Sequence, residues 1–266
     1  MNILNIFLKS KIFDNLNIFL VRKLFKIFKF FFVETELKTL PKINYPLIVI
    51  DKDLEHSKNF KVKDSRPYIS YVHLPDLLEV VSDNKQKTIF VDYGAGNLGL
   101  FYYLNRKFKN IEYFFKDQLI VEEKVKKIIE NEKIENLYLS DNLNSQTIDL
   151  LYFGSSLQYI DDYKDILKSF FKKSKYILIS QTPFFDNEHY KETIVLKQLN
   201  MHPNINYLNL FNFNFFLNFM KKNDYQLIER NVNKVTKFLN FKNFEKNKFK
   251  DIDMYDLLFK YKKNEK

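Results

Sequence analysis

The stretch VDYGAGNLGLFYYL, residues 91–104, decides the fold class of this chain. Three of the four glycines in the 266 residues lie in this short stretch, at Gly94, Gly96 and Gly99. They follow the strand-like run TIFVDY and precede a helix-like run. A strand, a G-x-G-x-x-G turn and a helix are typical of nucleotide-binding turns, where glycine allows a tight turn and a close approach of the backbone to the ligand. The alternative is a tight turn that needs only small residues.

From residue 68 onward, the chain alternates between strand-like and helix-like patterns. Alternation of this kind predicts an α/β fold with a mostly parallel sheet and helices on both faces. Near the C-terminus, 225–230 and 254–261 have no helix between them and predict an antiparallel pair at the sheet edge. Strands are predicted at 88–93, 111–115, 136–140, 148–153 and 176–180, and helices at 70–82, 98–108, 119–132, 161–173 and 212–223.

The composition excludes several function classes. The chain has no cysteine and only four scattered histidines, which argues against a disulfide framework and against a metal site. The formal net charge is +10, but only four of the 43 basic residues are arginine. Because nucleic-acid readers depend on arginine for bidentate contacts, the charge does not indicate a nucleic-acid partner. It fits the lysine, asparagine and phenylalanine bias of an AT-rich genome.

Asp92 distinguishes between the ligands that such a turn could bind. It stands two residues before Gly94, at the end of the predicted strand. A dinucleotide would bring a pyrophosphate to this turn, and the carboxylate would repel it. S-adenosylmethionine instead brings a sulfonium cation and an ammonium group. The position of Asp92 therefore favours S-adenosylmethionine.

Three motifs resemble a family of class I methyltransferases that are often encoded among surface-polysaccharide genes. The family pattern is L-D-F-G-G, then S-S-x-L-Q-Y, then I-D-R-T-P-F. This chain has V-D-Y-G-A at 91–95, S-S-L-Q-Y at 155–159 and I-S-Q-T-P-F at 179–184. The resemblance covers about residues 88–230. It implies a Rossmann-like class I methyltransferase fold, with a mostly parallel sheet, an antiparallel C-terminal strand and helices on both faces.

The resemblance also implies which residues bind the cofactor. The family has an acid at the end of the second strand that contacts the ribose, where this chain has Lys116 followed by Asp117. Asp141 either contacts adenine or caps the next turn. Ser180 and Gln181 replace the Asp and Arg of the third motif. The residues expected at the cofactor site are Asp92, Gly94, Ala95, Gly96, Gly99, Lys116, Asp117, Asp141, Ser155, Ser156 and Gln158.

Methyl transfer needs an acceptor lone pair held close to the methyl group, and in some reactions a base. The candidates above the carboxyl ends of the strands are Tyr159, Gln181, His189 and His202. Alternatively, each histidine is an ordinary surface or partly buried residue, and Tyr159 packs in the core. Positioning without a dedicated base is a further alternative.

Residues 1–45 are predicted to form a separate segment, a basic amphipathic helix and a linker, ahead of a cofactor-binding domain at 46–266. Ile18, Val21, Phe25, Phe28 and Phe32 form an apolar stripe at helical spacing. The stripe either docks on the protein itself or places residues 15–33 on a membrane surface. No apolar run reaches the length of a membrane span, so we expect a cytoplasmic protein, with membrane association as the alternative.

The sequence therefore predicts an S-adenosylmethionine-dependent methyltransferase that acts on a sugar, a glycan precursor or another small molecule, at oxygen or nitrogen. The glycan context rests on the family resemblance alone. The alternatives are a non-catalytic Rossmann-like binding protein and an NADP-dependent oxidoreductase. Lys116 could meet a 2′-phosphate in the latter. The methyl acceptor and the oligomeric state stay open.

Overall fold

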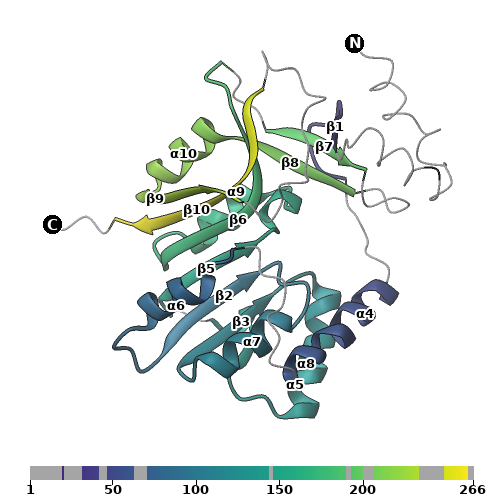
Figure 1. Cartoon of the computed structure of the whole chain (residues 1–266), viewed down its shortest axis with the longest axis vertical. Coiled ribbons are helices and arrows are strands. Elements are labelled where there is room, and N and C mark those ends of the chain that lie inside the picture. Colours follow the sequence, from purple (N-terminus) through teal and green to yellow (C-terminus); the bar gives the residue numbers. More distant parts are fainter. Residues whose placement is uncertain are drawn as a thin grey trace.

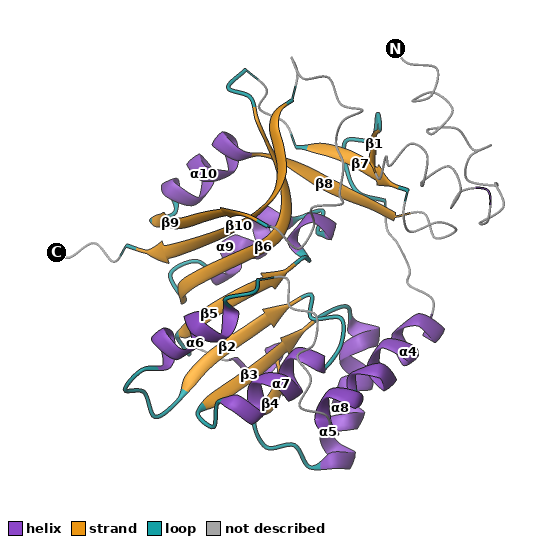
Figure 2. Ribbon diagram, viewed as in Figure 1, coloured by secondary structure: helices purple, strands orange, loops and turns teal. Residues whose placement is uncertain are grey.

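The strand-forming run before the glycines is the central strand β2, Thr88–Tyr93, of a large sheet (Figures 1 and 2). The computed structural model describes residue 20 and residues 32–41, 47–62, 71–143, 146–189, 193–199, 206–233 and 249–262. Strand β2 pairs in parallel with β3 on one side and with β5 on the other. The turn that follows it therefore lies at the carboxyl-end edge of the sheet, where its neighbours also end.

The main sheet has the predicted mixture of parallel and antiparallel pairs. Strands β4, β3, β2, β5 and β6 run parallel in that order, and β10 then pairs antiparallel with both β6 and β9. The predicted α/β sheet and its antiparallel C-terminal pair are confirmed. The bounds are Ile111–Lys116 for β3, Leu137–Leu139 for β4, Ile148–Gly154 for β5, Ser174–Asp186 for β6, Tyr225–Val232 for β9 and Lys250–Tyr261 for β10.

Helices cover both faces of the sheet because side chains alternate along each strand. Phe90 and Tyr113 pack into a core with α4, α6, α7 and α8, whereas Val91 and Phe114 pack into a second core with α9 and α10. The helices are α4 (Leu47–Ser57), α5 (Asn59–Val62), α6 (Leu74–Ser82), α7 (Gly99–Lys107), α8 (Leu119–Glu132), α9 (Tyr163–Phe170) and α10 (Phe213–Lys222), with single 3₁₀ turns η1 (Ser140–Leu143) and η2 (Leu157–Tyr159).

A second group of strands was not predicted from the sequence. Strand β6 does not end at Ser180 but continues to Asp186, and its upper part pairs with β8 (Asn206–Asn212). Strand β8 pairs antiparallel with β7 (Ile194–Gln198), and β7 with β1 (Phe32–Glu34). Figure 1 shows this group above the carboxyl ends of the main sheet. It has its own small core around Phe185, Leu196, Leu208 and Met254.

Strand β1 corrects the prediction of a helix that reaches Phe32. Phe32 and Val33 lie in a strand and are each only 1% exposed. Pairing with β7 explains the difference, since it satisfies the backbone and buries both side chains at once. Of the rest of the stripe, Ile18, Val21, Phe25 and Phe28 lie outside the described residues.

The domain boundary and the membrane contact through residues 15–33 stay predictions. Among the described residues, no helix is long and apolar enough to cross a membrane.

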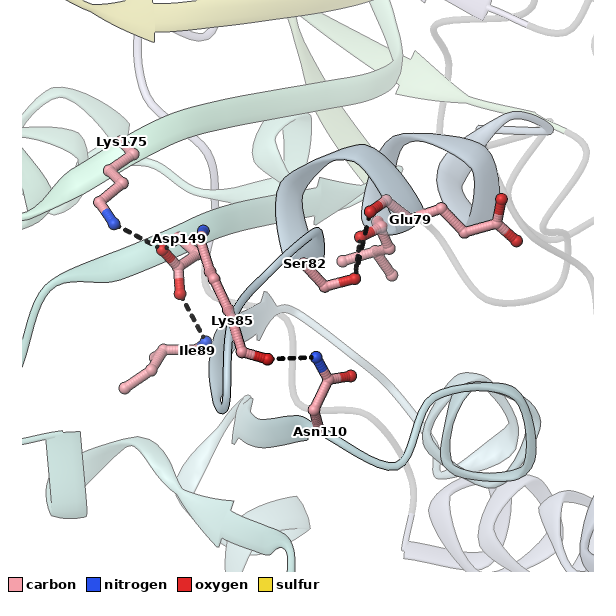
Figure 3. A network of polar contacts seen from close by, with 8 residues as sticks. Glu79, Ser82, Lys85, Ile89, Asn110, Asp149 and Lys175 are labelled. Atoms are coloured by element: carbon pink, nitrogen blue, oxygen red, sulfur yellow. Dashed lines mark hydrogen bonds and ion pairs between the residues drawn. The ribbon is translucent and has the colours of Figure 1, made fainter.

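Asp149 ties the opposite, amino-end edge of the sheet together (Figure 3). It lies in β5, and its side chain is 6% exposed. The carboxylate accepts hydrogen bonds from Lys85 Nζ at 2.8 Å, from Lys175 Nζ at 2.9 Å and from the Ile89 N–H at 2.9 Å. Burial alone would raise the pKa of Asp149, but these three bonds outweigh it and hold the pKa below its ordinary value. The charged form of Asp149 is thus stabilised by folding.

Replacing Asp149 with asparagine is expected to lower the free energy of unfolding at pH 7 by about 1–3 kcal/mol, because two charge-assisted bonds are lost. The lowered pKa makes this contribution complete above the pKa of the unfolded state. It is then lost as the pH falls through the folded pKa. The gap between the parent and Asp149→Asn in urea denaturation should therefore close below about pH 4. Glu112→Gln, which breaks the exposed pair with Lys87, is the control and should change stability little. A gap that persists unchanged to pH 3 would contradict the assignment.

Candidate functional site

Gly94 and Gly96, at the centre of the turn after β2, have different surroundings. Gly94 and Gly96 have φ angles of 74° and 68°, in the left-handed region that favours glycine. A Cβ atom on Gly94 would lie 2.4 Å from the Cβ of Ser156, whereas a Cβ on Gly96 would meet no atom within 4 Å. Gly94 is therefore required by packing inside the fold. Gly96 borders open space, where a ligand can approach the backbone.

Backbone bonds hold this turn against the end of β3. The N–H groups of Gly94 and Ala95 both donate to the carbonyl oxygen of Lys116, at 2.8 and 3.3 Å. Gly99 is the first residue of α7, and its N–H donates to Asn97 Oδ1 at 2.8 Å. The turn is thus fixed at both ends, with the start of α7 close behind it.

Asp92 lies beneath the turn and is 3% exposed. The hydroxyl of Tyr113 donates a hydrogen bond to its carboxylate. Burial raises the pKa of Asp92 to about 7, and the nearby charge of Asp117 adds to the shift, although the bond from Tyr113 opposes it. A cation bound at the turn would favour the charged form of this carboxylate.

Asp117 is a second carboxylate at the same turn. Its Oδ2 atom accepts from the N–H of Gly96 at 2.7 Å, and its Oδ1 atom accepts from the N–H of Gln118 at 2.7 Å. Burial raises the pKa of Asp117, while these two bonds oppose the shift. Asp117 and Gly96, both predicted at the cofactor site, are therefore in direct contact.

Lys116 is engaged by acids at the end of β3. Its Nζ atom lies 3.1 Å from Glu122 Oε1 and 3.8 Å from Asp141 Oδ1. The Glu122 side chain is 5% exposed, and that of Asp141 is 83% exposed. Lys116 therefore brings little uncompensated positive charge to the turn. Through its contact with Lys116, Asp141 lies at the same end of β3 as the glycine turn.

The motif after β5 forms a tight polar cluster around Gln158, which is 1% exposed. Gln158 Nε2 donates to the carbonyl and hydroxyl oxygens of Ser155, both at 3.1 Å, and to the carbonyl oxygen of Gln181 at 3.3 Å. Its Oε1 atom accepts from Thr182 Oγ1 at 3.1 Å. Ser156 donates through Oγ to the Tyr93 carbonyl oxygen. Ser156 thus holds the end of β2, and Gln158 links the turn after β5 to the backbone of β6 at Gln181.

Gln181 marks a kink in β6, with a φ angle of 51°. Two residues of β6, Ser180 and Gln181, lie opposite the single residue Asp256 of β10, where the pairing register shifts. Asp256 Oδ1 accepts from Ser180 Oγ at 2.6 Å, from the Gln181 N–H at 2.9 Å and from Asn233 Nδ2 at 2.8 Å. Asp256 is not among the site residues predicted from the sequence, where its only signal is an acid inside the apolar run MYDLLFKY.

The other residues predicted as catalytic candidates are Tyr159, His189 and His202. Tyr159 donates from its hydroxyl to Gln198 Oε1 at 3.0 Å, which links η2 to β7. His189 is exposed in the turn after β6. His202 lies outside the described residues. Within the described ranges, no group of three His, Cys, Asp or Glu residues could hold a metal ion.

Two cavities lie near the upper part of the sheet. The larger, of about 920 Å³, is a groove between the segment after β1 and the start of α9, and its lining includes Glu36, Asp165 and Phe215. The smaller, of about 410 Å³, is lined by residues just before α6, by the end of β9 and by Asp256. The smaller cavity therefore adjoins the kink at Gln181.

No family model matches the chain, and no curated protein is similar to it in sequence. Among solved structures, it is similar to 1,6-didemethyltoxoflavin-N1-methyltransferase of Burkholderia thailandensis, crystallised with 1,6-didemethyltoxoflavin and S-adenosylhomocysteine. The identity is 9% and the TM-score 0.50, over 87% of this chain and 95% of that one. A methyltransferase of Clostridium acetobutylicum that depends on S-adenosylmethionine is 13% identical, with a TM-score of 0.43, over 82% and 95%. The predicted Rossmann-like class I methyltransferase fold is confirmed.

Proposed function

We propose that this chain is a methyltransferase that uses S-adenosylmethionine as its methyl donor. The observation that carries the proposal is the open space over Gly96, where Asp117 accepts from the Gly96 N–H and Asp92 is buried beneath the turn. Asp117, together with the ionised form of Asp92, repels a phosphate and attracts a cation at this turn. S-adenosylmethionine has no phosphate and carries both a sulfonium and an ammonium group.

The residues of the turn fit this cofactor in type and placement. Asp92, buried beneath the turn, would stabilise the cationic methionine end. Asp117, at the end of the second parallel strand, would accept hydrogen bonds from the ribose hydroxyls. Asp141 would lie toward the adenine. When bound, the cofactor supplies an electrophilic methyl group, and the chain's own task is to hold an acceptor beside it.

An NADP-dependent oxidoreductase is the weaker proposal. It would need Lys116 to bind the 2′-phosphate, but Lys116 is paired with Glu122 and Asp141. The pyrophosphate would also have to approach Asp92 and Asp117. The charges at the turn therefore oppose a phosphate-rich ligand.

We propose a small-molecule acceptor that is methylated on oxygen or nitrogen. The motif resemblance supports a sugar or glycan precursor, and no residue contact in the structure adds to that support. Gln158 and Asp256 both fix the backbone of Gln181, at the edge where the acceptor would lie. We infer that these two residues position the part of β6 that would contact the acceptor.

The test of the function is a calorimetric titration of the purified protein with S-adenosylmethionine, S-adenosylhomocysteine and NADPH. The first two are expected to bind and NADPH is not. Binding of NADPH with no binding of S-adenosylhomocysteine would overturn the proposal. Binding followed by methyl transfer to candidate acceptors distinguishes an enzyme from a non-catalytic binding protein.

Gly96→Ala is expected to weaken S-adenosylhomocysteine binding more than tenfold and to lower the free energy of unfolding by only about 1–2 kcal/mol. The added Cβ meets no protein atom, so the stability cost comes from the left-handed φ alone. Calorimetry measures the binding and urea denaturation measures the stability. Unchanged affinity in a folded Gly96→Ala protein would show that no ligand approaches this part of the turn.

A further inference from the structure

The cavity of about 410 Å³ beside the kink, here called the Asp256 pocket, is lined by one carboxylate, by polar side chains that include His73 and Asn231, and by two valines. Asp256, Tyr71 and Asn233 line it together with Val72 and Val232. The two valines are 45% and 47% exposed, whereas Asp256 is only 7% exposed. The pocket therefore offers one buried carboxylate to a ligand, with apolar surface at its opening.

Among the residues that the structure describes, the hydrogen-bond donors to Asp256 are all uncharged. They are a hydroxyl of Ser180, a backbone N–H of Gln181 and the side-chain amide of Asn233. The basic residue Arg230 is stacked elsewhere, with its guanidinium carbon 3.9 Å from the centre of the Phe213 ring. The carboxylate of Asp256 is thus hydrogen-bonded by neutral partners, and a bound cation would offset its charge.

A second carboxylate strengthens the negative field at this place. Glu229 accepts a hydrogen bond from the Tyr71 hydroxyl at 2.8 Å, and Tyr71 lines the pocket. Burial raises the pKa of Asp256, and the charge of Glu229 raises it further, while the bonds from Ser180, Asn233 and Gln181 oppose the shift. A buried carboxylate whose charge is disfavoured by burial and by a second acid favours a positively charged ligand beside it.

The pocket adjoins the proposed methyl-transfer site through a continuous series of contacts. Asp256 bonds to Gln181, Gln181 to Gln158, and Gln158 to Ser155. Ser155 precedes Ser156, which lies against Gly94 of the turn. The pocket and the turn therefore share the carboxyl-end edge of the sheet.

We propose that the Asp256 pocket binds the protonated amine of the methyl acceptor, so that the substrate is a small amine with an apolar portion. The ammonium group lies against Asp256, and the apolar portion contacts Val72 and Val232. The inference rests on the proposed function, which it narrows to acceptors that carry an amine. The ammonium group anchors the substrate and has no lone pair, so the atom that attacks the methyl group is a second, uncharged oxygen or nitrogen of the same molecule.

Three probes of similar shape and different charge test the proposal. Benzylamine is a cation at pH 7, benzyl alcohol is neutral and benzoate is an anion. In ligand-observed NMR titrations of the full chain, benzylamine is expected to bind at least about tenfold more tightly than benzyl alcohol, and benzoate is expected not to bind. Equal binding of benzylamine and benzyl alcohol, or no binding of benzylamine, overturns the proposal.

Two variants locate the bound amine. Asp256→Asn should weaken benzylamine binding about tenfold or more and leave benzyl alcohol unaffected. Because Asp256 also supports the kink, Val232→Lys is a second variant, in which a cation is placed at the exposed opening. It should weaken benzylamine binding without disturbing the core. Asp165→Asn, in the larger groove, is the matched control and should change nothing. Loss of binding in Asp165→Asn with retention in Asp256→Asn and Val232→Lys would place the amine in the other cavity.

A calorimetric titration of the same preparations with S-adenosylhomocysteine separates this inference from the proposed function. Binding of S-adenosylhomocysteine with no benzylamine binding overturns the amine pocket alone. Benzylamine binding at Asp256 with no binding of S-adenosylhomocysteine overturns the methyltransferase and leaves an amine-binding pocket.

Discussion

Gly94→Ala is expected to destabilise the protein by about 2–5 kcal/mol, a large part of the total stability of a typical domain. The added Cβ would lie 2.4 Å from the Cβ of Ser156 and 2.9 Å from its Oγ atom. The backbone there also has a φ of 74°, which an L side chain adopts at a cost. Urea denaturation of the variant and the parent at pH 7 measures the difference.

The double variant Gly94→Ala/Ser156→Gly is the matched control for this prediction. It removes the Ser156 side chain that the new Cβ would meet. Measured against Ser156→Gly alone, which also loses the hydrogen bond to the Tyr93 carbonyl oxygen, the double variant should lack the packing part of the loss and keep the φ part. Gly96→Ala gives the second comparison, because its Cβ points into open space. A Gly94→Ala protein that is as stable as Gly96→Ala would show that the Ser156 contact does not constrain the turn.

Asp92→Asn is expected to have opposite effects on stability and on cofactor binding. Burial raises the pKa of Asp92 to about 7 in the folded protein, whereas an aspartate in the unfolded chain has a pKa of about 3.9. The folded protein therefore holds the proton more tightly than the unfolded chain, and stability falls as the pH rises from about 4 to about 7. Three pH units correspond to a cost of about 4 kcal/mol at pH 8. Asparagine does not titrate, so the variant should be the more stable protein at pH 8.

Binding of S-adenosylmethionine by Asp92→Asn should be about ten- to a hundredfold weaker, because the charge that faces the cationic methionine end is removed. Denaturation at pH 5 and pH 8 and calorimetry at pH 8 measure the two effects. Tyr113 remains able to donate to the asparagine oxygen, so the local packing is retained. If parent and variant differ equally at both pH values, Asp92 does not titrate in this range. Unchanged S-adenosylmethionine affinity would remove the main support for the proposed ligand.

Local pattern was sufficient for the elements around the glycine turn. β2 at 88–93 and α8 at 119–132 have their predicted bounds, and α7 differs by one residue at each end. The period of apolar residues depends on one element and the face it buries, so it can be read from a short window. The same window predicted a ligand-facing role for both Gly94 and Gly96, because sequence carries no information on what a missing Cβ would meet.

The short-range pattern of apolar residues did not predict β1, β7, β8 or the second half of β6. Strands β7 and β8 contain buried polar residues such as Lys197, Asn206 and Asn209, so their alternation is hidden. Strand β6 was predicted to end at Ser180, although it bends at Gln181 and continues. Phe32 repeats at helical spacing with residues before it, but its backbone pairs with Gln198. In each case a distant partner decided the structure.

The sequence by itself determined the order of strands and helices from α6 to the first part of β6, the glycine turn and the acids beside it, because those features depend on residues that are neighbours in the chain. The tertiary structure alone decided that Asp256 meets Gln181, which lies 75 residues away in sequence, and that Ser156 packs against Gly94. It also decided that Lys116 is neutralised by Glu122 and Asp141. The physical reason is that burial and pairing partners arise only when strands align, and they set the charge and the space that a ligand meets.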